Sequence, residues 1–537
     1  MKQIKQAIHE FVSEHARNTP IKTAVHFYGQ DITYEKLDVY VNLFAQYLLE
    51  NGVEKGDSVA LFLQNCPQYI ICHLGIQKIG ASVSPINPMF KEQELIYQLN
   101  DVGAEIIVTH DHLFPLVENI RANTKLKEVI VTNYQDFLPV NPQPAFPEAI
   151  TPKEEIPNST DLMEILESQL KQMPNVSIDV KEDVALILYT SGSTGMPKGA
   201  MLTYHNALWK TEAGIDMYQY NEKDIFLTVM PLTHIAGMLI GLNVPIVVGG
   251  TMVLLTRFVP DTVLDVIENN QITAAYTVVP MNVAIMHHTQ AIKTDFTSLR
   301  INNCTSFGIQ LTEEISNKWR ALTGVPLFEC AYGLTETHTA DTFMSPDAIR
   351  FGSVGKPVRG GDIKIASLEN IEEEAAIGEM GQILVKNDGV FKGYLNNPEA
   401  TAAAMKDGYL ITGDIGKFDD DGYLYFLGRT KEMIKCSGYS VFPEDVEELL
   451  GKHPGVQASA VIGVPDAVRG ESVKAFVVLK PGYENSITPE EIIAWSKENM
   501  ANYKYPRYIE FRTSLPVTKA GKLLRRLLAE EEQLKMK

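Results

Sequence analysis

The segment YTSGSTGMPKG, from Tyr189 to Gly199, is the most informative stretch of this sequence. It follows an apolar run at residues 184–188, which is typical of a buried strand. Its hydroxyls, glycine N–H groups and lysine can all donate hydrogen bonds to one anion, and the lysine adds positive charge. The segment therefore predicts a phosphate-binding loop directly after a strand. The candidate phosphate ligands are Thr190, Ser191, Gly192, Ser193, Thr194, Gly195 and Lys198.

This loop differs from the P-loop of nucleoside triphosphatases. The P-loop pattern has a wider spacing between its glycines and places its lysine directly after the second one. Here Gly192 and Gly195 lie closer together, and Pro197 precedes the lysine. The alternative is a flexible surface turn rich in glycine and serine. We favour the phosphate loop, because so many hydrogen-bond donors follow a core strand.

The length and charge of the chain limit what it can be. A chain of 537 residues is too long for one hydrophobic core and predicts two or more domains. Apolar and charged contents of 45% and 21% are those of an ordinary soluble globular protein. The net charge of −20 would repel a phosphate backbone, so we expect no nucleic acid as a partner.

The cysteines and the N-terminal residues predict a cytoplasmic protein. None of the five cysteines forms a C-x-x-C pair, which favours reduced thiols over disulfides or a zinc site. The N-terminus has no signal-peptide pattern. Instead, Ile4, Ile8, Phe11 and Val12 recur at helical spacing and predict an amphipathic surface helix.

The longest apolar stretch, residues 237–255, has the length of a membrane span. Its interior Pro245 and the adjacent Gly249 and Gly250 favour a helix, a turn and a strand at residues 251–255. We therefore expect no membrane span here. Peripheral membrane contact stays an open alternative.

Strands and helices alternate through about the first four hundred residues of the chain. We expect strands at residues 58–63, 82–86 and 105–109, and helices at residues 67–79 and 91–101. This βαβ rhythm favours parallel sheets covered by helices. A Pro- and acid-rich interval at about residues 139–183 predicts a long surface excursion with a short helix.

The pattern changes after residue 352, where short strands alternate with glycine turns. Strands are expected at residues 378–385, 389–394, 408–413 and 422–428, which predicts a small β-rich or barrel-like subdomain. A compact α+β region follows residue 428. Its expected helices begin at residues 443 and 489, and its expected strands cover residues 458–464 and 473–479.

Four further segments carry candidate functional residues. They are YGLTET at residues 332–337, TGD at residues 412–414, GRTKEMIKCSGYSVFPE at residues 428–444 and LPVTKAGK at residues 515–522. Together with the first loop, they resemble the signature motifs of the adenylate-forming superfamily, in the same order along the chain. That superfamily includes acyl-CoA synthetases, beetle luciferases and the adenylation domains of peptide synthetases. Residues 87–100 look most like the fatty-acid–CoA ligases.

The resemblance implies an α/β fold with two domains. A large N-terminal domain, residues 1–428, would contain two α/β sheet subdomains and a small β-barrel-like subdomain, and would bind ATP and the acyl substrate. A small mobile α+β cap domain, residues 429–537, would follow a hinge near Lys431. The hinge residue is often acidic in the family, and here it is lysine.

The resemblance also assigns roles in nucleotide binding. Tyr332 would stack on adenine, and Gly308 would lie beside the nucleotide. Thr335 would contact phosphate, and Asp414 would accept hydrogen bonds from both ribose hydroxyls, a role that suits a carboxylate with two oxygens. Arg429 would contact ribose or phosphate.

The remaining implied roles concern the chemistry. Glu336 would hold Mg²⁺, since a carboxylate beside a phosphate site needs a cation between the two. Lys522 would bridge the substrate carboxylate and the α-phosphate and stabilise negative charge in the transition state. Lys435, with Gly438 and Tyr439, would face the site after the cap rotates into its thioester-forming orientation.

The acyl pocket is expected around PLTHIAGM, residues 231–238, which resembles the family segment whose histidine lines that pocket. This assigns His234 to the pocket, with a buried structural histidine as the alternative. The chain departs from the family at SFGIQL, residues 306–311, where Phe307 and Ile309 replace small residues. These side chains would narrow the acyl tunnel and shorten the accepted chain, or would simply repack.

The implied function is an ATP-dependent acid–thiol ligase with a medium- or long-chain fatty acid as substrate. It would release AMP and pyrophosphate and use ATP, Mg²⁺ and CoA. The alternatives are a ligase for an aryl or short branched acid, a stand-alone enzyme that loads a carrier protein, and an inactive binding protein. A homodimer also stays open.

Overall fold

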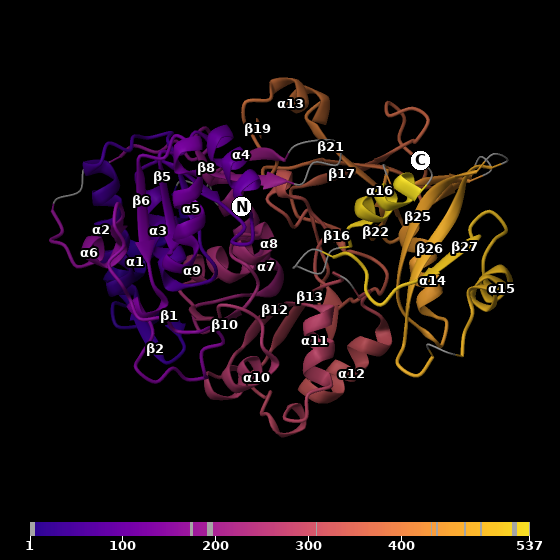
Figure 1. Cartoon of the computed structure of the whole chain (residues 1–537), viewed down its shortest axis with the longest axis horizontal. Coiled ribbons are helices and arrows are strands. Elements are labelled where there is room, and N and C mark those ends of the chain that lie inside the picture. Colours follow the sequence, from indigo (N-terminus) through magenta and orange to yellow (C-terminus); the bar gives the residue numbers. More distant parts are fainter. Residues whose placement is uncertain are drawn as a thin grey trace.

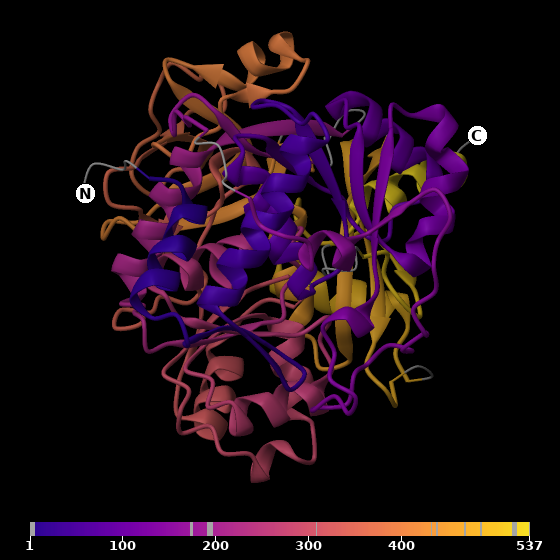
Figure 2. The same ribbon diagram turned by 90° about the vertical axis from the view of Figure 1, so that its left-hand side faces the viewer.

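The computed structural model describes residues 6–171, 176–190, 197–307, 309–430, 432–436, 439–466, 469–483, 486–517 and 523–535. Two large sheets, with helices packed on them, form the N-terminal two thirds of the chain. A smaller β-rich sheet follows them, and the C-terminal α+β region lies at the opposite end of the molecule (Figure 1). Viewed from the N-terminal side, the C-terminal strands lie behind the N-terminal sheets (Figure 2).

The first large sheet has eight strands and carries the predicted phosphate loop. Its central strands are parallel, but the last two pairs at the loop end are antiparallel. In order across the sheet, the strands are β19 (Gly393–Tyr394), β9 (Lys198–Thr203), β8 (Val184–Thr190), β4 (Ser82–Pro85), β3 (Ser58–Phe62), β5 (Ile106–His110), β6 (Glu128–Thr132) and β7 (Thr160–Asp161).

The second large sheet has seven strands, of which all but β2 pair in parallel. Across the sheet, the order is β14 (Leu327–Glu329), β13 (Ile301–Thr305), β12 (Ala274–Val278), β10 (Ile225–Thr228), β11 (Thr251–Leu254), β1 (Thr23–Phe27) and β2 (Gln30–Thr33). Parallel strands place their carboxyl ends at one edge of the sheet, so residues that follow β12, β13 and β14 lie close together.

One hydrophobic core joins the two sheets. It includes Val25 of β1, Leu61 of β3 and Leu254 of β11. Helix α3 (Pro67–Lys78) also contributes to this core, and its residues from Pro67 to Gln77 are all buried. Most side chains of α3 are apolar and the helix has no exposed face before Lys78, so it must be covered on every side, and a place between two sheets provides that.

The other helices of this part are amphipathic or short. They are α1 (Ile8–Asn18), α2 (Tyr34–Glu50), α4 (Glu92–Val102), α5 (Phe114–Ile120), α6 (Leu162–Leu166), α7 (Tyr204–Tyr218), α10 (Pro260–Asn269), α11 (Val279–Met286) and α12 (Glu313–Thr323). Helix α7 begins after Thr203, whose hydroxyl accepts a hydrogen bond from the N–H of Asn206 at 3.2 Å. Thr203 therefore caps this helix in the usual way.

The long apolar stretch contains the predicted helix, turn and strand. It forms α8 (Ile235–Met238), the π-helical turn η4 (Leu239–Asn243), α9 (Val244–Val248) and then β11. Gly249 ends α9 with a left-handed φ of 71°, which glycine adopts without strain. Among the residues that the structure describes, no helix is both long enough and apolar enough to cross a bilayer.

The β-rich subdomain has a five-stranded antiparallel sheet. Its strands are β17 (Asp362–Ala366), β18 (Gly381–Lys386), β20 (Met405–Lys406), β21 (Tyr409–Phe418) and β22 (Leu424–Arg429). Next to it lie the hairpin of β15 (Thr342–Phe343) and β16 (Lys356–Pro357) and the helix α13 (Pro398–Ala404). The strand expected at residues 389–394 is reduced to β19, because only its last two residues pair, and they pair with β9 of the first sheet.

The C-terminal region is an α+β unit with a core of its own. Its strands are β23 (Ile434–Cys436), β24 (Tyr439–Val441), β25 (Val456–Asp466), β26 (Gly470–Leu479) and β27 (Tyr508–Phe511), and its helices are α14 (Pro443–Gly451), α15 (Pro489–Asn499) and α16 (Arg525–Lys535). Val446, Val461, Val473 and Ile492 form the centre of the core. A separate core fits the expected separate domain.

Most sequence expectations for individual elements are confirmed. The helices predicted to begin at residues 67, 91, 443 and 489 begin within one residue of those positions. The strands predicted at residues 58–63, 82–86 and 105–109 are β3, β4 and β5. The N-terminal helix is α1, with Ile8 and Val12 buried. Its predicted first residue, Ile4, lies outside the described residues.

Candidate active site

Several residues predicted for the site lie outside the part of the chain that the structure describes. They are Ser191, Gly192, Ser193, Thr194, Gly195, Gly308, Lys431, Gly438 and Lys522. For Tyr439 the structure gives the backbone, which belongs to β24. The site is therefore built below from the described residues: Thr190, Lys198, His234, Phe307, Ile309, Tyr332, Thr335, Glu336, Asp414, Arg429 and Lys435.

The two ends of the predicted phosphate loop are held side by side. β8 ends at Thr190 and β9 begins at Lys198, and these two residues are register partners in the antiparallel ladder. The hydroxyl of Tyr189 donates to Asp101 Oδ2 at 2.7 Å, and that of Tyr97 donates to the carbonyl of Pro197 at 2.7 Å. Tyr97 and Asp101 both lie on α4, so this one helix fixes the strand ends on either side of the loop.

Glu336 and Lys198 meet through a third side chain, Tyr394. The hydroxyl of Tyr394 donates to Glu336 Oε1 at 2.8 Å. The ammonium of Lys198 lies 4.4 Å from the centre of the Tyr394 ring, within the range of a cation–π contact. Thus the structure brings together the lysine of the first motif and the carboxylate of the second. Thr335 precedes Glu336 in the short turn η6 (Thr335–Thr337) and is half-buried.

The second cluster joins Tyr332, Asp414 and Arg429. The hydroxyl of Tyr332 donates to Asp414 Oδ2 at 2.7 Å, and Arg429 Nε lies 3.0 Å from Asp414 Oδ1. Asp414 is buried, whereas Arg429 is half-buried. The Tyr332 ring stacks on Phe426 with ring centres 6.0 Å apart. Burial and the charge of Asp414 raise the pKa of Tyr332, so its hydroxyl remains a hydrogen-bond donor.

A buried ion pair supports the turn that carries Glu336. Lys210 Nζ lies 2.7 Å from Asp341 Oδ1, and both side chains are 0% exposed. Lys210 also donates to the carbonyl of Ala340 at 2.9 Å, and Asp341 accepts from Thr337 Oγ1 at 2.5 Å and from Asn387 Nδ2 at 2.8 Å. These contacts tie the end of η6 to helix α7 and to the loop after β18. The sequence motifs gave no sign of this pair, because Lys210 and Asp341 are 131 residues apart.

The backbone after Glu336 turns in an unusual way. His338, Thr339 and Ala340 all have positive φ values, of 54°, 58° and 51°. A Cβ on Gly333 would lie only 2.3 Å from the N of Ala340, so this position requires glycine. Left-handed backbone at consecutive non-glycine residues is strained and persists only where its surroundings hold it. The Lys210–Asp341 pair provides such a restraint directly behind the turn.

Two neighbours of the segment at residues 306–311 are defined by the structure, an aromatic contact and a half-buried carboxyl group. Phe307 packs edge-to-face on His234, with ring centres 6.3 Å apart. Glu329, at the end of β14, accepts hydrogen bonds from the N–H and the hydroxyl of Ser306. Burial raises the pKa of Glu329 to about 7 in spite of these hydrogen bonds. The side chain of Ile309 is 39% exposed, so its place in the pocket remains a prediction.

In the C-terminal domain, Lys435 has an exposed side chain, and its N–H donates to Glu471 Oε2 at 2.7 Å.

In the same domain, Arg525 is surrounded by glutamates. Its guanidinium lies 2.5 Å from Glu432, 2.7 Å from Glu444 and 2.7 Å from Glu447. Burial raises the pKa of Glu444 to about 7, although Arg525 opposes this shift. Arg525 therefore joins the start of α16 to α14 and to the segment before β23.

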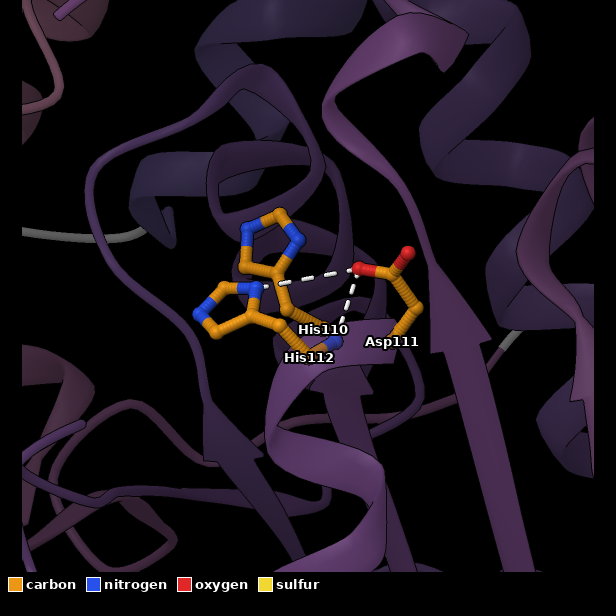
Figure 3. Close-up of side chains that lie close together, drawn as sticks. All are labelled: His110, Asp111 and His112. Atoms are coloured by element: carbon orange, nitrogen blue, oxygen red, sulfur yellow. Dashed lines mark hydrogen bonds and ion pairs between the residues drawn. The ribbon is translucent and has the colours of Figure 1, made fainter. Parts of the chain in front are cut away.

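Among the residues that the structure describes, His110, Asp111 and His112 form a further group of potential metal ligands (Figure 3). The two imidazole rings are stacked, with planes only 24° apart and centres 5.3 Å apart. A metal must lie in the plane of each ring at about 2 Å from its nitrogen, and stacked rings do not direct their lone pairs at one such point. Asp111 already accepts from Asn133 Nδ2 at 2.7 Å. The two rings are thus stacked aromatic groups in this conformation, and burial lowers the pKa of His110 to about 3.

The carboxylate of Glu336 has the chemistry that Mg²⁺ prefers. Mg²⁺ binds hard oxygen ligands, usually one or two carboxylates together with substrate phosphates and water. Glu336 is half-buried, and Oε1 accepts the hydrogen bond from Tyr394. Lys198 nearby can neutralise phosphate charge on the same side. Glu336 and Lys198 therefore fit a site in which the carboxylate would hold a magnesium ion beside the phosphates of a nucleotide.

Comparison with known proteins agrees with this arrangement. The family model for AMP-binding enzymes matches residues 12–395, and the model for the C-terminal domain of AMP-binding enzymes matches residues 445–522. The chain is 36% identical over 543 aligned positions to a long-chain-fatty-acid–CoA ligase of Bacillus subtilis (strain 168), with 98% of this chain and 95% of the relative covered.

Solved structures match over almost the whole chain as well. ATP-bound MatB from Rhodopseudomonas palustris has a TM-score of 0.85 at 27% identity, covering 98% of this chain and 99% of that one. The anthranilate CoA ligase AuaEII in complex with anthranoyl-AMP has a TM-score of 0.85 at 28% identity, covering 98% of both chains. The matches cover both the large N-terminal part and the small C-terminal part. The chain therefore belongs to the AMP-binding, or adenylate-forming, enzyme family.

Proposed function

We propose that this AMP-forming acyl-CoA synthetase activates a medium- or long-chain fatty acid and transfers the acyl group to CoA. The main support is the convergence of residues from distant motifs at one place. Lys198, Glu336 and Tyr394 are linked by direct contacts, and so are Tyr332, Asp414 and Arg429. A cluster that combines cations, a metal-binding carboxylate and paired hydrogen-bonding groups is suited to a nucleoside triphosphate.

In the first half-reaction, a carboxylate oxygen of the acid attacks the α-phosphorus of ATP, and pyrophosphate leaves. The new bond is the mixed anhydride of an acyl-adenylate. Thr190 and Lys198, with the glycine-rich loop between them, would bind the phosphates, and Glu336 would hold Mg²⁺. The ion would supply positive charge beside the phosphates. Lys522 would stabilise the negative charge that develops on the α-phosphate and the acid.

Tyr332, Asp414 and Arg429 would bind the nucleoside in this reaction. Tyr332 would stack on adenine, and Asp414 would accept hydrogen bonds from the ribose hydroxyls. Asp414 is held by Tyr332 at 2.7 Å and by Arg429 at 3.0 Å, so its carboxylate is oriented before the nucleotide arrives. Such orientation reduces the entropy lost on binding.

In the second half-reaction, the thiol of CoA attacks the acyl carbon, a thioester forms and AMP leaves. We propose that residues 429–537 rotate as a cap about a hinge near Lys431 between the two steps. The rotation would move Lys522 away and bring Lys435, Gly438 and Tyr439 to the site. The separate core of the C-terminal domain supports a rigid-body motion of this kind.

The choice of a fatty acid rests on the relative from Bacillus subtilis and on the apolar character of the expected pocket. Phe307 and His234 pack against each other there, and Phe307 also contacts a core cluster that contains Met230 and Tyr276. An aryl or short branched acid is the second candidate. Phe307 favours it, because a bulky ring in the wall shortens the space for an acyl chain. A carrier protein is the alternative acceptor.

The decisive experiment uses the purified full chain and a panel of carboxylic acids. Isotope exchange between pyrophosphate and ATP should depend on the acid, with saturated acids of medium or long chain giving the highest kcat/KM. With CoA present, AMP release should match acyl-CoA formation one to one. A preference for benzoate-type acids would replace the fatty acid by the aryl alternative. The complete absence of exchange with every acid would contradict the proposed reaction.

A further inference from the structure

Tyr394 lies between the strand that follows the phosphate loop and the turn that carries Glu336. It lies in β19 (Gly393–Tyr394), which falls between β18 and β20 of the five-stranded sheet in the chain but pairs with β9 of the eight-stranded sheet. Its register partner is Ala200, two residues after Lys198, and the next residue, Leu395, donates from its N–H to the carbonyl of Gly199 at 2.8 Å. This short strand therefore fixes Tyr394 directly beside the exit of the phosphate loop.

The same segment is also attached to the turn that carries Glu336. The N–H of Phe391 donates to the backbone carbonyl of Glu336 at 2.8 Å, and the hydroxyl of Tyr394 donates to the carboxylate of Glu336 at 2.8 Å. Glu336 is thus held by this segment at its backbone and at its side chain. A carboxylate held at one oxygen has fewer rotamers available, so less entropy is lost when a ligand binds the other oxygen.

The Tyr394 ring has a second partner in Lys198. The ammonium lies 4.4 Å from the ring centre, and the ring itself packs edge-to-face on Phe391 with centres 4.8 Å apart. The ring is therefore fixed by apolar packing, by the strand and by the cation. The hydroxyl alone reaches Glu336.

We propose that Tyr394 is a positioning residue that orients the carboxylate of Glu336 toward Mg²⁺·ATP through its hydroxyl and orients Lys198 through its ring. The inference rests on the proposed function, because it takes Glu336 as the magnesium ligand and Lys198 as a phosphate ligand. It adds that the two groups are coupled by one side chain from a third segment. Tyr394 lies outside the motifs that the sequence analysis singled out.

The test removes the hydroxyl and keeps the ring, with Tyr394→Phe. ATP binding is measured by titration calorimetry in the absence of any acid, once with Mg²⁺ and once with EDTA. Loss of a hydrogen bond to a charged group is expected to weaken ATP binding about tenfold with Mg²⁺. With EDTA, the variant and the wild type should bind ATP equally, because the hydroxyl acts through the metal ligand.

Tyr47→Phe is the matched control. Tyr47 also donates its hydroxyl to a glutamate, Glu128, but it lies on α2, and Glu128 begins β6, near the opposite edge of the eight-stranded sheet from β19. The control should bind ATP like the wild type. Tyr394→Leu, which removes the ring as well, should weaken ATP binding further, because Lys198 then loses its contact.

A double-mutant cycle with Glu336→Gln separates positioning from a general structural role. If Tyr394 acts through the carboxylate, Tyr394→Phe should have no further effect on ATP binding in the Glu336→Gln background. The proposal would be overturned if Tyr394→Phe weakened ATP binding equally in the wild-type and Glu336→Gln backgrounds, or equally with and without Mg²⁺. It would also be overturned if Tyr394→Phe bound ATP like the wild type. These binding measurements need no acid. The absence of pyrophosphate exchange in the wild type would instead count against the proposed function alone.

Discussion

The ammonium of Lys210 lies 2.7 Å from Asp341 Oδ1, and neither side chain is exposed to solvent. The pair is hydrogen-bonded to the turn η6 and to the strained segment after it. Lys210 donates to the carbonyl of Ala340, and Asp341 accepts from Thr337. Burial lowers the pKa of Lys210, which the nearby Asp341 opposes. A buried ion pair adds little net stability compared with an apolar pair, but the loss of one partner leaves an unpaired buried charge.

Lys210→Met should therefore destabilise the protein by about 3–5 kcal/mol. The double variant Lys210→Met/Asp341→Asn should recover much of this loss, because no buried charge remains unpaired. Urea unfolding of the wild type and both variants measures these differences. Lys318→Met is the control, since its ion pair with Glu314 is exposed, and it should change stability by about 0.5 kcal/mol or less. A double variant as unstable as Lys210→Met would show that charge pairing does not explain the effect.

Asp414→Asn should weaken nucleotide binding. The substitution keeps the size of the side chain but removes the charge that pairs with Arg429 and the second acceptor oxygen. The KM for ATP should rise about tenfold to a hundredfold, as expected for the loss of a hydrogen bond to a charged group. Asp419→Asn is the control, because Asp419 pairs with Arg350 in the same sheet region. An unchanged KM for ATP in Asp414→Asn would remove Asp414 from the proposed nucleotide site.

The contribution of Glu329 to the stability of the protein should fall as the pH rises from about 4.5 to about 7, opposite to the contribution of buried histidines such as His110, whose pKa burial lowers. Burial raises the pKa of Glu329 from 4.5 to about 7, so in this window the folded state binds the proton and the unfolded state releases it. The stabilisation is complete below pH 4.5 and is lost as the pH passes 7. Glu444 titrates over the same window, with its pKa also raised to about 7 by burial.

Glu329→Gln isolates the first of these two groups. The slope of unfolding free energy against pH should become more positive in this window, by the equivalent of up to about one proton, because glutamine does not titrate. The measurement is chemical unfolding at a series of pH values with the wild type in parallel. Identical slopes for both proteins would show that Glu329 titrates normally in the folded state.

Phe307→Ala should change the preference for acyl chain length. Phe307 packs on His234 in the expected pocket wall, and its removal makes space for additional methylene groups. The ratio of kcat/KM for palmitate to that for octanoate should rise about tenfold. Phe418→Ala, in β21 of the five-stranded sheet, is the control and should leave the ratio unchanged. A falling ratio would mean that Phe307 supports long chains instead of limiting them.

Lys522→Ala and Lys435→Ala should damage different half-reactions. Lys522→Ala should abolish acid-dependent pyrophosphate exchange but still convert supplied acyl-adenylate and CoA to thioester. Lys435→Ala should retain more of the pyrophosphate exchange than of the thioester formation, since its role is proposed for the second orientation of the cap. Single-turnover assays of each half-reaction measure this. Lys519→Ala is the neighbouring control and should retain both half-reactions. Loss of the same half-reaction in both variants would contradict the two-orientation mechanism.

Much of the fold followed from local patterns in the sequence. Apolar runs and βαβ alternation predicted strands such as β3, β4 and β5 and helices such as α3 and α4, and the structure confirms them. These patterns are reliable because a buried strand or helix must repeat its apolar side chains with its own period. The strand expected at residues 389–394 was mostly wrong, because its pairing depends on a partner strand about 190 residues earlier in the chain.

The sequence by itself determined which chemical groups are present: the hydroxyl- and glycine-rich loop, the acid at Glu336, the aspartate at Asp414 and the lysines near the end of the chain. Only the tertiary structure decided which of them meet. Tyr394 contacts both Lys198 and Glu336, and Lys210 pairs with Asp341, although no motif links these residues. The reason is physical. Side-chain identity is a local property, whereas contacts across 58 or 131 residues of chain depend on how sheets and helices pack together.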